Sequence, residues 1–144
     1  MRHTYIIVMT SALLTAPTVW AEGSSTEKSS TCVAVPIFHC VQHLADRSAI
    51  GHFGYDLQCP EDAGDDAEVY IDINENNQFS PGRIDRGQPK TFVSGKHIDE
   101  FEVDFTEEEV NAGTVINWSV LGQTAMVDFS KMKDESVDCS FMSQ

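Results

Sequence analysis

The sequence predicts an all-β protein, an immunoglobulin-like antiparallel β-sandwich of about seven strands that is stapled by disulfides. Short stretches of alternating apolar and polar residues recur along the chain, separated by Gly, Pro, Asn and Asp. Helix is expected only as a single turn, over Glu107–Val110. The four cysteines are an even set without any Cys-x-x-Cys pair, which in a small exported chain favours two disulfides over a metal cluster.

The N-terminal residues predict export. Residues 1–21 combine a positively charged start, a short apolar run and a small last residue, which is typical of a secretory signal peptide. The apolar run is shorter than the ~20 residues that a membrane-spanning helix needs, so no membrane insertion is expected. Residues 22–31 are small and polar and are expected to form a flexible leader. One β-sandwich domain is therefore expected over residues 32–144, in the periplasm, outside the cell or on its surface.

The charge balance limits the class of partner. Asp and Glu number 23 against nine Lys and Arg, for a net charge of −14. Such a chain is repelled by nucleic acid and by anionic membranes. It can bind cations, basic proteins or neutral glycans. The alternative is that the negative charge only keeps the protein soluble. The expected partner is therefore an unknown protein or glycan.

The first pair of strands is expected to form a hairpin. Phe38–His43 and Ile50–Tyr55 flank a polar turn over Ala45–Ser48, which is an antiparallel hairpin signal. Placing Val41 opposite His52 would put the following side chains on the core face: Phe38, Cys40, Phe53 and Tyr55.

This hairpin bears on the disulfide pairing. Extending its strands outward brings Cys32 close to Cys59, which leaves Cys40 for Cys139. The hairpin therefore favours the Cys32–Cys59 and Cys40–Cys139 pairing. Spacing alone does not choose among the three pairings, and the other two stay open.

Further strands are expected where apolar and polar residues alternate, over Glu68–Ile73, His97–Phe105, Thr114–Leu121, Thr124–Phe129 and Val137–Phe141. In the second of these, three apolar residues face the core: Phe101, Val103 and Phe105. The third and fourth strands form a hairpin around Gly122-Gln123.

Two sets of charged or titratable side chains are expected on outer faces, one on the first hairpin and one on the His97–Phe105 strand. His39, His43 and His52 are expected on one face, but two histidines four residues apart on a strand are separated by roughly 13 Å. Only a pair that includes His52, with an added ligand, could hold a first-row metal; solvent-facing histidines are the alternative. The second set is a row of acids that could dock a positive partner or keep the sheet from sticking to other chains, Glu100, Glu102 and Asp104.

A weak calcium motif follows the Glu68–Ile73 strand. Asp72, Asn74 and Asn76 place oxygens at alternate positions, as in a calcium-binding loop. Asn77 could take the left-handed conformation that such a loop needs at its next position. The match fails at the twelfth position, where Arg83 replaces a glutamate, and an Asn-rich turn is the alternative. No other cofactor is expected.

The segment from Asn76 to Pro89 combines turn residues, an aromatic anchor and two arginines. Phe79 is expected to be buried. Asp85 is expected to bind local backbone amides, and Arg86 to reach a carbonyl or an acid on a neighbouring strand. These roles describe a pinned crossover between sheets; the alternative is a ligand-binding loop that presents Arg83, Arg86 and Gln88.

Catalytic motifs are not found. The sequence has no Gly-x-Ser-x-Gly, His-Glu-x-x-His or phosphate-binding loop. The expected function is therefore that of a non-catalytic exported interaction or surface-associated module. A calcium-stabilised extracellular binding protein is the alternative, and a small secreted hydrolase is the third.

Three motifs resemble an uncharacterised module of exported bacterial proteins, whose pattern is FGYxN, NNxFSPGxxDRGQPxxFxPG and WxLxGxTA. Here they read FGYD from Phe53, NNQFSPGRIDRGQP from Asn76, and WSVLGQTA from Trp118, and the resemblance spans roughly residues 36–130. It implies a β-sandwich in an exported setting, without an activity, and a disulfide from Cys40 to a late cysteine. The chain departs from the pattern at Ser94, where the module has proline.

Overall fold

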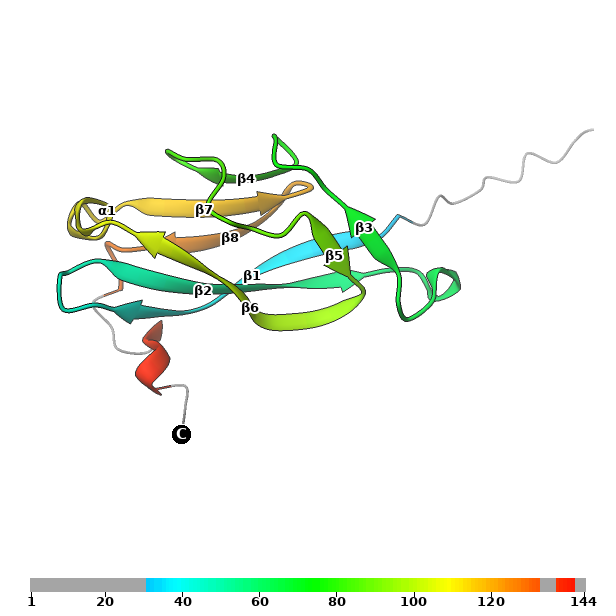
Figure 1. Ribbon diagram of the computed structural model, residues 1–144, viewed down its shortest axis with the longest axis horizontal. Coiled ribbons are helices and arrows are strands. Elements are labelled where there is room, and N and C mark those ends of the chain that lie inside the picture. Colours follow the sequence, from blue (N-terminus) through cyan, green and yellow to red (C-terminus); the bar gives the residue numbers. More distant parts are fainter. Residues whose placement is uncertain (1–30, 133–136, 142–144) are drawn as a thin grey trace, which may run out of the picture.

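A computed structural model describes residues 31–132 and 137–141 (Figure 1). The predicted signal peptide, and all of the predicted leader except Thr31, lie outside this part of the chain. The elements are, in order, β1 (Val33–His43), β2 (Ala49–Gln58), the 3₁₀ turn η1 (Glu61–Ala63), β3 (Glu68–Tyr70), β4 (Asn77–Ser80), β5 (Thr91–Val93), β6 (Gly95–Phe105), α1 (Glu107–Asn111), β7 (Val115–Val120), β8 (Gln123–Asp128) and the 3₁₀ turn η3 (Cys139–Phe141).

The strands form two facing sheets and a small third one. One sheet has the order β1-β2-β6 and the other β4-β7-β8, while β3 pairs with β5 alone. All pairings between these strands are antiparallel. The two larger sheets lie one above the other in Figure 1. The all-β prediction is confirmed, and the structure is consistent with a β-sandwich; an immunoglobulin-like arrangement stays a prediction.

The first hairpin is confirmed, but its register differs from the expected one. Strand β1 carries a bulge between Phe38 and Cys40, so that Cys40 lies opposite His52 and Val41 opposite Gly51. The prediction of Val41 opposite His52 is therefore wrong by one residue. The extra residue reverses the alternation: Val41 is fully buried in the core, and Cys40 lies on the outer face of the sheet.

The disulfides join Cys32 to Cys59 and Cys40 to Cys139. This is the pairing that the hairpin favoured, although Cys40 reaches its partner from the outer face. The expected last strand over Val137–Phe141 is wrong. Asp138 makes one isolated parallel bridge to Val41, and η3 follows at once. Asp138 itself causes the bend, because its carboxylate accepts a hydrogen bond from the backbone N–H of Ser140 at 2.8 Å.

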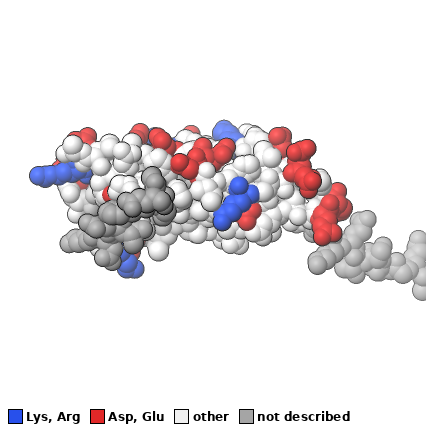
Figure 2. All heavy atoms as spheres, turned by 90° about the horizontal axis from the view of Figure 1, so that it is seen from below, with Lys and Arg blue, Asp and Glu red and all other residues white. Residues whose placement is uncertain are grey.

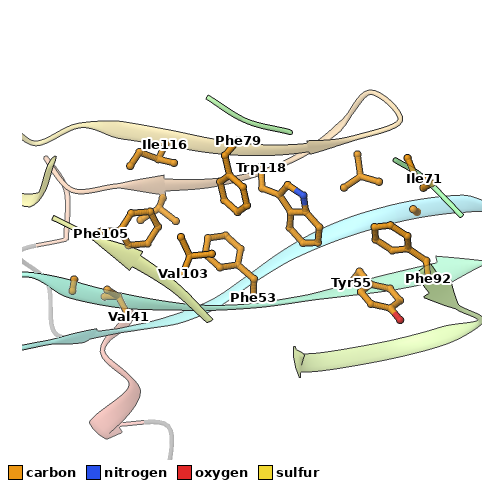
Figure 3. Packing of buried hydrophobic residues seen from close by; sticks show 14 of the residues in the cluster. Val41, Phe53, Tyr55, Ile71, Phe79, Phe92, Val103, Phe105, Ile116 and Trp118 are labelled. Atoms are coloured by element: carbon orange, nitrogen blue, oxygen red, sulfur yellow. The ribbon is translucent and has the colours of Figure 1, made fainter. Parts of the chain in front are cut away.

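Aromatic side chains fill the space between the two sheets (Figure 3). Phe53 from β2 meets Phe79 and Trp118 edge-on, with ring centroids 5.5 and 6.0 Å apart. Phe101 is partly buried and packs edge-on against Trp118 at 4.9 Å. Val103 and Phe105 are buried, as the alternation of β6 predicted. This cluster links β2, β4, β6 and β7 into one core.

The other expected elements are found with altered bounds. The β7–β8 hairpin turns at Leu121-Gly122, both with positive φ, one residue earlier than expected. Helix α1 begins with a capping box between Thr106 and Glu109. Strand β3 ends at Tyr70, and the next residue, Ile71, is buried in the core while its backbone N–H donates to the carbonyl of Lys90 at 2.7 Å. Strands β4 and β5 were not expected: they have four and three residues, too few to show alternation.

Candidate functional site

The segment that begins at Asn76 is organised around a buried asparagine. Asn77 is fully buried at the start of β4. Its amide nitrogen donates hydrogen bonds to the carbonyls of Ile71 and Pro89, at 3.1 and 2.8 Å. Its side-chain oxygen accepts a hydrogen bond from the indole nitrogen of Trp118 at 3.0 Å. One side chain thus joins both ends of the loop to the centre of the core.

Gln88 and Asp85 bind the backbone of the same loop. Gln88 is 4% exposed. It donates to the carbonyl of Ile84 at 2.8 Å and accepts from the backbone N–H of Arg86 at 2.8 Å. Asp85 accepts from the backbone N–H of Gly87 at 3.0 Å. These contacts replace the regular strand pairing that an irregular loop lacks.

Arg86 connects the loop to strand β6 and to helix α1. Its guanidinium is 7% exposed and forms a two-pronged ion pair with Glu109 of α1, at 2.5 and 3.4 Å. It also donates to the carbonyl of Asp104 on β6 at 3.5 Å and lies over the ring of Phe105. The expected partner on a neighbouring strand is therefore this carbonyl, and the acid comes from the helix.

The environment of Glu109 favours its ionised form. Burial by itself would raise the pKa of this carboxyl group. Hydrogen bonds from Arg86 and from the backbone and hydroxyl of Thr106 outweigh burial and hold the pKa below its ordinary value. The ion pair is therefore charged at neutral pH.

These contacts are the ones that a pinned crossover needs, and the choice between a structural and a ligand-binding loop stays a prediction. Phe79 is fully buried and stacks on Trp118. Asp85, Arg86 and Gln88 contact the protein's own groups. Arg83 is exposed, and its guanidinium donates to the carbonyl of Asp85 at 3.4 Å. The central role of Asn77 was missed, because its sequence neighbours indicated a turn and not a buried strand.

Two of the three side chains of the calcium motif, those of Asp72 and Asn74, make contacts within the protein. Asp72 forms an ion pair with Lys90 at 3.0 Å and accepts from the backbone N–H of Ile73. The hydrogen bond from Lys90 is the main reason why the pKa of Asp72 is lowered. The side-chain oxygen of Asn74 accepts from the backbone N–H of Asn76, whose own side chain is exposed.

Asn77 lies in β4, so the expectation of a left-handed conformation at this position is wrong. The regular ladder with β7 needs extended backbone there. Across residues 31–132 and 137–141, no three or more His, Cys, Asp or Glu side chains are grouped to hold a metal ion.

The three histidines do not share a face. The bulge in β1 places His43 opposite Ala49, a core-facing residue, at the end of the strand, whereas His52 lies on the outer face. His39 lies at the bulge itself. The prediction of one histidine face is wrong, because it assumed unbroken alternation.

His52 has an acidic partner on the neighbouring strand. Its Nδ1 lies 2.6 Å from the carboxylate of Asp99, a residue of β6 with a φ of 61°. The carboxylate of Glu102 is 3.9 Å from the same nitrogen. The other ring nitrogen, Nε2, is buried and has no hydrogen-bond partner within residues 31–132 and 137–141.

Acidic side chains mark the outer side of β6. Glu100, Glu102 and Asp104 are all exposed. Glu102 and Asp104 lie opposite His52 and Ile50, but a register shift between Phe53 and Tyr55 takes Glu100 out of this pairing. Figure 2 shows acidic side chains along one edge and at one end of the molecule.

Among the described residues, the outer face of the other sheet carries no unpaired charge. Its residues are amides, hydroxyls and two apolar side chains, and we call it the uncharged face: Gln78, Ser80, Val115, Asn117, Ser119, Thr124 and Met126. The carboxylate at its end, Asp128, is bound to Ser130 and Lys131 and is only 12% exposed. Sequence reasoning missed this face because it looked for charged and metal-binding residues.

A pocket of about 420 Å³ lies between the end of α1 and the end of β8. Among its described lining residues, the one with a titratable side chain is His43; the others include Val110, Phe129 and Met132. An acid–base pair of described side chains is therefore not assembled in this pocket.

Comparisons with protein-family models, curated proteins and solved structures give no match. The family resemblance drawn from the three motifs thus stays a prediction. Of the helices within the described segments, none has the length and hydropathy to cross a bilayer.

Proposed function

We propose that this protein is a non-catalytic exported module that binds its partner through a sheet surface, and that a neutral glycan fits this surface best. The observation that supports the proposal is the uncharged face. On a chain with a net charge of −14, the outer side of a whole sheet presents uncharged side chains and one neutralised carboxylate.

The chemistry of the uncharged face suits a ligand rich in hydroxyl groups. On one rung, Gln78, Ser119 and Thr124 lie side by side across the three strands. The hydroxyls of Ser119 and Thr124 are 3.1 Å apart and hydrogen-bonded to each other. On the next rung, Asn117 lies beside Met126, which is 52% exposed. Amides and hydroxyls both donate and accept, and the thioether supplies an adaptable apolar contact.

The size of the face favours a linear chain over a globular partner. Three strands ~4.8 Å apart, with up to six residues at ~3.4 Å each, cover roughly 300 Å². A standard protein–protein interface buries about 800 Å² on each partner. A sugar chain lying across the strands needs no larger surface.

Three observations support export. All four cysteines are paired in disulfides, which persist in oxidising compartments. The N-terminal residues have the pattern of a signal peptide, and the three motifs resemble a module of exported bacterial proteins. Absence of catalysis is proposed because Asp85, Arg86 and Gln88 bind groups of the protein itself.

Affinity electrophoresis through gels that contain soluble neutral polysaccharides, such as a β-glucan, a galactomannan and starch, tests the proposal. We expect at least one of them to retard the protein. Asn117→Asp keeps the side-chain shape but adds a charge to the middle of the face, and should abolish the retardation. Gln42→Glu makes the same change at an exposed position of β1 and should leave it intact. No retardation by any of the three, or equal loss in both variants, would contradict the proposal.

A further inference from the structure

The edge strands of the two larger sheets differ in how their outer sides are covered. Strand β1 contains Pro36, which lacks an N–H, and it forms the bridge from Val41 to Asp138. Strand β4 is bound by its own loop, since the backbone N–H of Phe79 donates to the carbonyl of Ile84 at 3.0 Å. Strand β8 borders β1 of the facing sheet. Strand β6 pairs with β2 on one side, which leaves its other side as the open edge.

The backbone groups on the open side of β6 belong to its acidic residues. The carbonyl of Asp104 accepts a hydrogen bond from Arg86 of the loop, so it points away from β2. The direction of the backbone groups alternates from residue to residue along a strand. Glu102 therefore also directs its N–H and C=O to the open side, whereas Val103 directs its groups to Gly51 on β2. Beyond the ladder with β2, no backbone group of the described residues binds Glu102.

The side chains of β6 determine which strand could be added at this edge. Glu102 and Asp104 are exposed on the outer side of the sheet. On the inner side, Val103 is buried, and Phe101 is only partly buried where it packs against Trp118. An added strand would place every second side chain beside the carboxylates and the others beside the inward-facing apolar residues.

We propose that the open edge of β6 binds an extended segment of another protein, in which Lys or Arg alternates with apolar residues, as an additional antiparallel strand. Backbone hydrogen bonds supply the affinity in this mode of binding, and the alternate side chains supply the specificity. Opposite charges on directly paired residues stabilise a sheet. The net charge of −14 attracts a basic segment from a distance. This edge and the uncharged face belong to different sheets, so the proposal does not depend on glycan binding.

A second copy of this chain does not suit the same edge. A symmetric antiparallel pair of β6 strands centred on Glu102 would place Glu100 opposite Asp104. Like charges directly opposite each other destabilise a sheet. The acidic row therefore disfavours pairing between two copies and favours a basic segment.

The test is binding of a fluorescently labelled peptide, Lys-Val-Lys-Val-Lys-Val, followed by fluorescence anisotropy at about 0.15 M salt, which screens non-specific charge attraction. In the proposed pairing the lysine residue opposite Glu102 directs its backbone N–H to β6, and the valine N–H groups face solvent. Methylation of the lysine backbone nitrogens should weaken binding at least tenfold. Methylation of the valine nitrogens should leave binding intact, although the peptide charge is the same.

The peptide controls decide whether a strand is added. Lys-Lys-Lys-Val-Val-Val has the same composition without the alternation, and it should bind at least tenfold more weakly than the alternating peptide. No binding of the alternating peptide, or equal binding of the scrambled peptide or of both methylated peptides, would overturn the proposal.

Variants of the protein locate the binding edge. The double variant Glu102→Gln, Asp104→Asn should bind the peptide about fivefold more weakly. The control Glu61→Gln, Asp62→Asn removes the same charge from exposed positions of η1 and should stay within about twofold of the wild type. Hydrogen exchange of the Glu102 amide, measured by NMR, should slow when the peptide binds. Equal weakening in the two double variants, or unchanged exchange at Glu102, would overturn the assignment to β6.

Discussion

Trp118 donates its indole N–H to the side-chain oxygen of Asn77 over 3.0 Å, in the middle of the core. Asn77 in turn binds the carbonyls of Ile71 and Pro89. The core of one sheet and the irregular loop are therefore held by a single buried amide. This relationship explains why a polar residue stands at a fully buried position.

Replacing Asn77 should destabilise the protein strongly. Asn77→Ala leaves the indole N–H and two carbonyls buried without partners, at a cost of about 3 kcal/mol in the free energy of unfolding. Urea unfolding followed by tryptophan fluorescence measures the loss. Asn76→Ala is the matched control, since the side chain of Asn76 is exposed. Equal stability of the two variants would show that the buried amide is dispensable.

The ion pair between Arg86 and Glu109 should contribute to stability. Glu109→Gln keeps the shape but weakens two charge-assisted hydrogen bonds to a guanidinium that is 7% exposed, and should cost about 2 kcal/mol. Glu108→Gln changes an exposed acid on the same helix and should stay within about 0.5 kcal/mol of the wild type. The urea midpoints of the two variants decide between these outcomes.

This contribution should depend on pH in a defined direction. The pKa of Glu109 is below its ordinary value of 4.5 in the folded protein. Its stabilising effect is therefore complete above that value and is lost as the pH falls through the folded pKa. The difference in unfolding free energy between the wild type and Glu109→Gln should shrink as the pH is lowered from 7 to 3. A constant difference would contradict this account of the ion pair.

Calcium should leave the thermal stability unchanged. Asp72 already has a cationic partner in Lys90, and the oxygen of Asn74 is used by the backbone. A ligand that bound the folded protein would raise its melting temperature. Melting curves recorded with calcium and with chelator should therefore coincide. A clear upward shift with calcium would restore the calcium-binding alternative.

The elements that could be predicted from the sequence are the strands in which apolar and polar residues alternate over several positions. The inward face of β6 and the β7–β8 hairpin follow from apolar residues at every second position. The bulge in β1 could not be predicted, because one inserted residue is visible only in the pairing with β2. This bulge decides on which face of the sheet Cys40, Val41 and His43 lie.

Part of the candidate site could be predicted from the sequence, namely the loop contacts, whereas the uncharged face could not. The roles of Asp85 and Arg86 follow from short-range chemistry, since an aspartate binds amides two residues on and a buried arginine needs an anion. The uncharged face could not be recognised in advance. Its members come from three strands, and β4 is too short to be identified by alternation. Only the pairing brings Gln78, Ser119 and Thr124 onto one rung.

The most direct test of the central proposal is a chemical-shift map of the ¹⁵N-labelled protein titrated with a neutral oligosaccharide from the polysaccharide that retards it most. We predict that the shifted backbone amides cluster on β4, β7 and β8, around Asn117 and Ser119, while the outer side of β6 is unaffected. Shifts that cluster on β6 around Glu102 and Asp104, or no shifts with any neutral oligosaccharide, would contradict the assignment of the uncharged face as the binding surface.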